Sequence, residues 1–174
     1  MDGRISVEVF PDKSYKFRMT YNYTSHTDWF AISEPSTTVV FQTELAQVVL
    51  YDHMGDPLDG GEIRYAAGSW QDFGTTGDDG PGTATKELFS GSRKFRVTYN
   101  YTQETKTQSI SYPVVFQTGA VHSDSGTCTK YAAGSWRPFT QDIELLPGSR
   151  KFRFNDGTPD TYYTIEVGIV NLIH

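Results

Sequence analysis

The sequence predicts an all-β chain of antiparallel immunoglobulin-like β-sandwich repeats. The hexapeptide Tyr-Ala-Ala-Gly-Ser-Trp that begins at Tyr65 recurs letter for letter from Tyr131. Apolar residues alternate with polar ones at a period of two, which is typical of half-buried strands. Turn residues (Gly, Pro, Asp and Asn) separate these short runs, and no run shows a helical stripe. Short alternating strands divided by turns favour a sandwich.

Two further phrases recur along the chain. The residues Lys-Phe-Arg, followed after one position by Thr-Tyr-Asn-Tyr-Thr, begin at Lys16 and again at Lys94. The phrase Val-Val-Phe-Gln-Thr occurs at 39–43 and again at 114–118. Self-similarity at this spacing is the signature of a repeat architecture, in which each copy is one structural unit.

The phrases are not shared equally among the copies. The hexapeptide is missing from the first 43 residues, while the third copy keeps it and is shorter in its turns. We therefore predict a partial repeat with only the later strands at 1–43, a complete sandwich at 44–118 and an abbreviated repeat at 119–174.

Three strands follow directly from the alternation. One apolar face holds Phe95, Val97, Tyr99 and Tyr101, and the first copy shows the same pattern from Tyr15 to Tyr23. Near the C-terminus, Ile165, Val167 and Ile169 alternate with Glu166 and Gly168. We expect each of these runs to be a half-buried strand.

Composition excludes several classes of protein. The chain of 174 residues has a net charge of -6, whereas nucleic-acid binding needs a dense field of Lys and Arg. Its single cysteine, Cys128, allows neither an intramolecular disulfide nor a cysteine zinc cage. No run approaches the roughly 18 apolar residues of a membrane-spanning helix. We expect no nucleic-acid partner and no membrane insertion.

Two segments, 52–63 and 87–96, resemble the turns of small extracellular immunoglobulin-like modules. They are similar to carboxypeptidase-regulatory-like and Cna-B-like domains, which are transthyretin-like sandwiches. The recurring phrases also resemble tandem repeats of large bacterial surface proteins. The resemblance covers 44–118 and part of the flanks, and it implies a stalk, spacer or adhesive module that lies outside the cell or on its surface. The run 47–51 has no lysine where Cna-B-like domains place one for an isopeptide crosslink, so we assign none.

Acidic residues gather in two turn-rich segments. They are Asp52, Asp56, Asp59, Asp78 and Asp79. Calcium takes hard oxygen ligands from flexible turns, so it is the ion that these residues would suit. The alternative is that each Asp bonds nearby backbone amides and stabilises its own turn. We expect no required cofactor.

The repeated aromatics suggest a second kind of site. Trp70 and Trp136, with Tyr65 and Tyr131, could stack cell-surface glycans, although a recurring Trp more often serves packing. The histidines and serines match no catalytic motif, so we predict no enzyme, and a hydrolase with a dispersed triad ranks third.

The incomplete first repeat is the strongest indication of function. Phe17 and Phe41 lack part of an opposing sheet, and exposed sheet edges recruit strands. Either the third copy completes the first repeat within the chain, or another chain donates a strand to it. For the second case we predict self-association through these residues and through the C-terminal run of Ile165, Val167 and Ile169. The partners would be other copies of the chain or neighbouring repeats. The interpretation is a non-enzymatic structural or adhesive protein, such as a fibre or surface-array subunit; the alternatives are a carbohydrate-binding module and a fragment of a longer repeat array.

Overall fold

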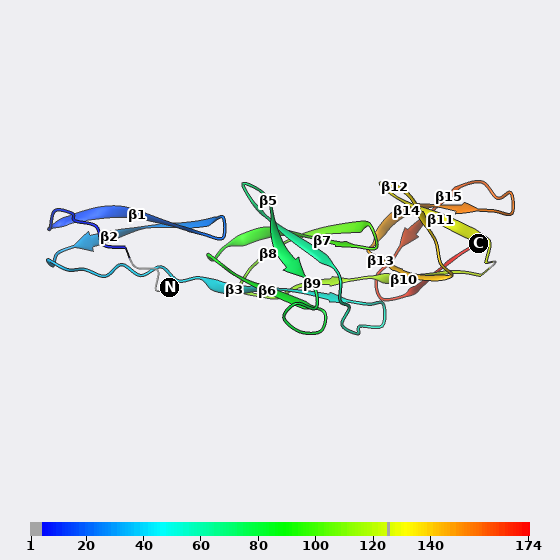
Figure 1. The fold of residues 1–174 in the computed structure, drawn as a ribbon, viewed down its shortest axis with the longest axis horizontal. Coiled ribbons are helices and arrows are strands. Elements are labelled where there is room, and N and C mark those ends of the chain that lie inside the picture. Colours follow the sequence, from blue (N-terminus) through cyan, green and yellow to red (C-terminus); the bar gives the residue numbers. More distant parts are fainter. Residues whose placement is uncertain (1–4, 125) are drawn as a thin grey trace.

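A computed structural model describes residues 5–124 and 126–174. These residues form sixteen strands and no helix, which confirms the predicted all-β class. The strands follow one another along a rod from the N-terminal to the C-terminal end (Figure 1). None of the described residues forms a helix long and apolar enough to cross a membrane.

The second repeat is a two-sheet sandwich of seven strands. They are β3 (Glu44–Tyr51), β4 (Glu62–Ala67), β5 (Ser69–Thr75), β6 (Thr83–Leu88), β7 (Ser92–Tyr99), β8 (Thr102–Ser109) and β9 (Val114–Gln117). One sheet has the order β6-β3-β9 and the other β5-β4-β7-β8. All pairings are antiparallel except that of β9 with β3, which is parallel. Between the sheets lies a core that includes Leu50, Phe95 and Phe116.

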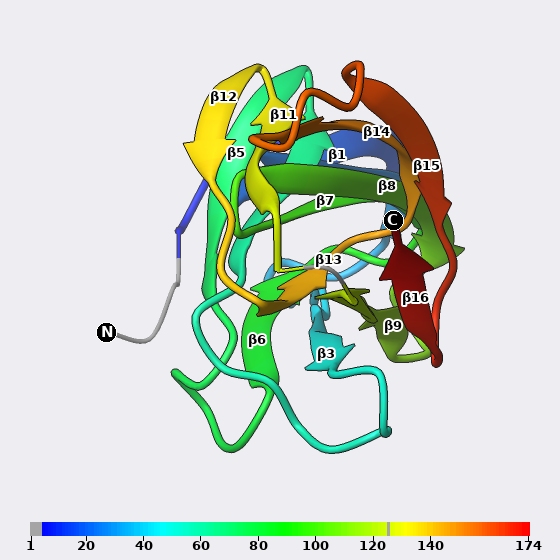
Figure 2. The ribbon, with the colours of Figure 1, turned by 90° about the vertical axis from the view of Figure 1, so that its right-hand side faces the viewer.

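The third repeat has the same topology in fewer residues. Its strands are β10 (Gly119–Ser123), β11 (Cys128–Ala133), β12 (Ser135–Pro138), β13 (Asp142–Leu145), β14 (Gly148–Phe154), β15 (Thr161–Ile165) and β16 (Val170–Ile173). The sheet orders β13-β10-β16 and β12-β11-β14-β15 match those of the second repeat, and β16 again runs parallel to β10. Seen along the rod, the four-stranded sheets lie on one side and the three-stranded sheets on the other (Figure 2).

The first repeat holds one hairpin, β1 (Lys13–Tyr21) with β2 (Thr24–Ile32). The phrase that begins at Lys16 in β1 recurs from Lys94 in β7, so β1 and β2 are the counterparts of β7 and β8. The segment 39–43 has the same five residues as 114–118, yet it forms no strand, whereas Val114–Gln117 is β9. A strand needs a partner, and β9 has β3 beside it.

Two predicted strands are wrong at their ends. Asn100 and Tyr101 have φ values of 44° and 59° and form a tight turn between β7 and β8, so Tyr101 does not continue the apolar face of β7. Asn22 and Tyr23 form the equivalent turn. Positive φ at both central residues is the geometry of type I′ hairpins, whose twist matches that of the strands.

The predicted C-terminal strand is also interrupted. β15 ends at Ile165, and residues 166–169 form a turn in which Gly168 has a φ of 70°. After this turn, β16 crosses to the other sheet and pairs with β10. The alternating pattern of Ile165, Val167 and Ile169 therefore spans a strand end and a turn. Glycine is the residue that adopts this left-handed conformation at no steric cost.

Candidate assembly surface

The turn between β7 and β8 of the second repeat reaches into the third repeat. The Tyr131 hydroxyl donates to the backbone oxygen of Asn100 at 3.0 Å. The Asn100 side-chain amide donates to the backbone oxygen of Glu144 at 2.9 Å. The backbone N–H of Leu146 donates to the Thr102 hydroxyl at 2.9 Å. We call this set of contacts a joint.

The same joint links the first repeat to the second. Tyr65 donates to the backbone oxygen of Asn22 at 2.6 Å, and the Asn22 amide donates to the backbone oxygen of Glu87 at 2.9 Å. The N–H of Phe89 donates to the Thr24 hydroxyl at 3.0 Å. Burial raises the pKa of both joint tyrosines, which keeps their hydroxyls protonated and able to donate.

A further contact joins the last residue of each Val-Val-Phe-Gln-Thr phrase to the next repeat. The Thr118 hydroxyl bonds the Glu144 carboxylate, and the Thr43 hydroxyl bonds the Glu87 carboxylate. Each boundary is thus crossed by the hairpin turn on one side and by the main chain on the other. The joint was not predicted from the sequence, although two recurring phrases indicate it. The phrase Tyr-Asn-Tyr-Thr occurs only in the first two repeats, and the hexapeptide only in the last two.

The four aromatics predicted to stack glycans do not form one platform. Tyr65 and Tyr131 are each 1% exposed, and their hydroxyls belong to the joints. Trp70 and Trp136 lie in separate repeats, and an arginine covers one face of each ring. The guanidinium carbon of Arg96 lies 3.9 Å from the Trp70 ring centroid, and that of Arg153 lies 4.0 Å from Trp136. Cation–π packing therefore occupies a face that a sugar would use.

The predicted calcium ligands lie in turns, where most of them accept backbone hydrogen bonds. Asp52 accepts from the amides of Met54 and Asp56, Asp59 from Gly82, Asp78 from Thr75, and Asp79 from Thr85, at 2.6 to 2.9 Å. Within residues 5–124 and 126–174, no group of three or more His, Cys, Asp or Glu side chains could hold a metal ion. Calcium binding stays a prediction, and these bonds are those of turn-stabilising aspartates.

The first repeat has an open sheet edge. In the second repeat β7 lies between β4 and β8, but β1 pairs only with β2 among the described strands. Four positions of the second repeat are 0% exposed, namely Phe95, Val97, Val114 and Phe116. Their counterparts in the first repeat, Phe17, Met19, Val39 and Phe41, are only partly buried, and Met19 is 36% exposed. The same apolar positions are therefore less covered in the first repeat.

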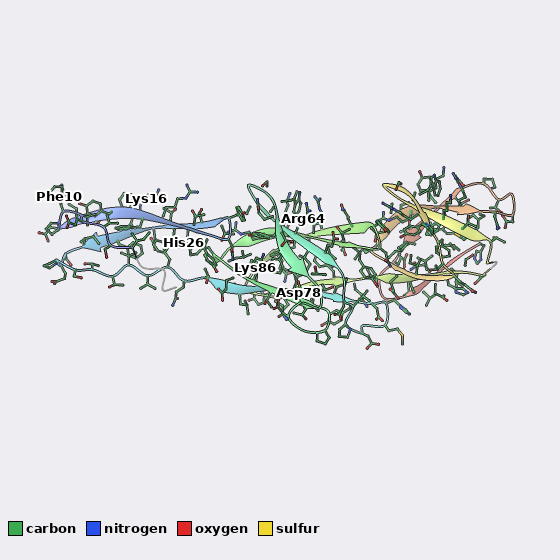
Figure 3. The ribbon with its side chains drawn as sticks, in the orientation of Figure 1. Phe10, Lys16, His26, Arg64, Asp78 and Lys86 are labelled. Atoms are coloured by element: carbon green, nitrogen blue, oxygen red, sulfur yellow. The ribbon has the colours of Figure 1, made fainter. Side chains whose placement is uncertain are left out.

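A groove lies between β2 and the segment that follows it. Its volume is about 460 Å³, and it is lined by His26, Asp28 and Phe30 of β2, by residues 40–44 and by Ser90. The Phe41 ring lies 5.7 Å from that of Phe30 and 5.8 Å from that of His26, measured between centroids. Figure 3 shows His26 on the side of the hairpin that faces this segment, while Phe10 and Lys16 lie toward the N-terminal end of the rod.

The residues predicted for self-association lie at opposite ends of the rod. Phe17 and Phe41 belong to the open first repeat, whereas the other three belong to the end of the third repeat (Figure 1). Ile165 is 1% exposed and packs in the third core. Val167 and Ile169, each 46% exposed, lie in the turn before β16. The structure thus gathers only Phe17 and Phe41 into one surface.

Comparison with known proteins gives weak similarities. No family model and no curated protein sequence matches the chain. Among solved structures, the chain is similar to the Bacillus anthracis TIE protein at 11% identity and a TM-score of 0.37, covering 86% of this chain and 36% of that one. It is also similar to a Streptococcal ancillary pilin at 11% identity and a TM-score of 0.33, covering 94% of this chain and 75% of that one. We therefore base the proposed function on the contacts of this chain.

Proposed function

We propose that this chain is a non-enzymatic structural subunit of an extracellular fibre or surface array. In this proposal, the first repeat joins neighbouring units by β-strand pairing. The observation that carries the proposal is the open edge, where β1 has one partner and 39–43 has none among the described strands. Unpaired N–H and C=O groups on such an edge are a template for another strand.

The joints support the role of a spacer. β9 ends at Gln117 and β10 begins at Gly119, so the three-stranded sheets of neighbouring repeats are linked through a single residue. On the other side, the hairpin turn is fixed by the joint hydrogen bonds. Two attachments at each boundary resist bending better than a single linker does.

Burial at the open edge provides a driving force for association. Full burial of a Phe, Val or Met side chain contributes roughly 1.5–3 kcal/mol. Phe17, Met19, Val39 and Phe41 are already partly buried, so together they would gain on the order of 5 kcal/mol from a covering strand. This gain only offsets the lower end of the cost of association, so the main-chain hydrogen bonds of the added strand would have to supply the net free energy of assembly.

Light scattering coupled to size-exclusion chromatography tests the proposal, with electron microscopy of the same fractions. We expect larger species as concentration rises, and we expect Phe41→Asp to abolish them. Met54→Asp is the control, because Met54 is 76% exposed in a turn of the second repeat and does not line the groove. A wild-type chain that stays monomeric at millimolar concentration would overturn self-association.

A further inference from the structure

We infer that the joint between the second and third repeats binds a linear acidic polysaccharide built from sugar acids such as uronic acids. A groove of about 520 Å³ lies here, where the β7–β8 hairpin meets the third repeat (Figure 1). We call it the joint groove. It is lined by Tyr101 and the start of β8, by the end of β11, by the start of β14 and by Tyr162 of β15. The inference goes beyond the proposed function, because this groove lies outside the first repeat.

The lining of the joint groove is positively charged. It contains Arg150 and Lys151 but no Asp or Glu, in a chain whose net charge is -6. The Arg150 guanidinium donates to the backbone oxygens of Ser149 at 3.0 Å and Pro147 at 3.5 Å. No carboxylate of the described residues forms an ion pair with it, and burial lowers its pKa. Each of its two terminal nitrogens keeps an N–H that a ligand carboxylate could accept.

Two further cations lie close to Arg150. Lys151 is 35% exposed, and its Nζ is 3.8 Å from an Asp160 oxygen, which is a weak surface pairing. The guanidinium carbon of Arg137 lies 3.7 Å from the ring centroid of Tyr101, one of the lining residues. Stacking on an aromatic ring orients a guanidinium and leaves its edge able to bind a carboxylate. Several cations at one groove suit a polymer that carries repeated negative charges.

An open aromatic ring in the same lining points to a sugar. Tyr162 is 67% exposed and lies opposite Lys151 in the pairing of β14 with β15. Among the described residues no guanidinium covers this ring, unlike the rings of Trp70 and Trp136. The C–H face of a pyranose can pack on such a ring, while the hydroxyl stays available for a hydrogen bond. Cations beside an open ring favour a sugar acid over an acidic peptide.

The first joint carries an incomplete version of this site. It repeats most of the lining as Tyr23-Thr24, Ala66-Ala67-Gly68 and Ser92-Arg93-Lys94. The strand registers show two differences. Thr107 stands where the third repeat has Tyr162. Gln71 stands where it has Arg137. We therefore expect one strong site for each chain, at the joint between the second and third repeats.

Isothermal titration calorimetry on the full chain tests this site. The probes are three acidic hexasaccharides, made of galacturonate, of mannuronate and of hyaluronan. Cellohexaose is the neutral control, and hexaglutamate is the acidic control without sugar. We expect at least one acidic hexasaccharide to bind at one site for each chain, with an affinity that falls as salt is added, and neither control to bind.

Substitutions that exchange the two joints give the sharpest comparison. Tyr162→Thr with Arg137→Gln gives the joint groove the residues of the first joint, and it should weaken binding about ten-fold or more. Tyr112→Thr is the matched control, because Tyr112 is also 67% exposed but lies outside the groove. The reverse exchange, Thr107→Tyr with Gln71→Arg, should add a second site to the chain.

Failure of all three acidic hexasaccharides to bind would overturn the inference, and so would equal binding of hexaglutamate. Unchanged affinity after Tyr162→Thr with Arg137→Gln would also overturn it. If that variant loses its fold in urea unfolding, the reverse exchange decides, because a chain that still binds at one site would refute the role of these two positions. Phe41→Asp should bind the sugar as the wild type does, so this result is independent of self-association.

Discussion

The joint between the second and third repeats should lose stability when Thr102 becomes Val. Thr102 is 2% exposed, and its hydroxyl accepts the N–H of Leu146, which is 0% exposed. Val keeps the shape of the side chain but cannot accept this bond. An orphaned buried N–H costs roughly 1–3 kcal/mol, and the new methyl group returns about 0.8 kcal/mol. Val also loses the bond that the Thr102 hydroxyl donates to the backbone oxygen of Tyr99 at 2.7 Å, which contributes about 1 kcal/mol. We expect Thr102→Val to lower the free energy of unfolding by about 1–3 kcal/mol, measured by urea denaturation with tryptophan fluorescence.

Thr105→Val is the matched control on the same strand. Thr105 is exposed in β8, so this change should stay within about 0.5 kcal/mol of the wild type. Hydrogen exchange at the Leu146 amide gives an independent measurement, because this N–H should exchange faster only in Thr102→Val. Equal losses for the two variants, with unchanged exchange at Leu146, would refute the role assigned to the joint.

Three other outcomes are expected. Phe116→Ala should cost about 3–5 kcal/mol, whereas Phe41→Ala in the identical pentapeptide should cost less than about 2 kcal/mol, since Phe41 is only partly buried; urea unfolding compares them. Burial raises the pKa of the Cys128 thiol from 9.0 to about 11, so the stability that it contributes is full below pH 9.0 and lost toward pH 11. The native thiol should also react slowly with a thiol reagent at pH 8. The hydrogen bond from Arg153 lowers the pKa of Asp160, so Asp160→Asn should reduce the loss of stability as pH falls through the acid range.

The phrase Val-Val-Phe-Gln-Thr shows how far local sequence predicts structure here. It is β9 at Val114–Gln117 and an unpaired segment at 39–43, although the five residues are the same. Alternation reports which face of a segment is apolar, but pairing depends on a strand that is distant in sequence. The repeat phrases indicated that the first copy is partial. They could not show that its segment 39–43 would stay outside any sheet.

The hairpin turns were harder to predict for a different reason. The usual sign of a two-residue turn is Asn-Gly or Asp-Gly, and here the second position is Tyr. The alternating pattern therefore seemed to continue through Tyr101, which the structure places in the left-handed region. The joint supports this conformation, since Asn100 is bonded through both its side chain and its carbonyl. A neighbouring repeat thus helps to determine a local turn.

The parallel pairing of β3 with β9 determines how the chain would carry mechanical load. The chain enters the second repeat at Glu44, the first residue of β3, and leaves at Gln117, the last residue of β9. Tension along the rod pulls these two ends apart, and because the strands are parallel, it shears their ladder lengthwise. All the hydrogen bonds of the pair then bear force together instead of opening one at a time. β10 and β16 repeat this arrangement, so each complete repeat is loaded in the direction in which a sheet is strongest.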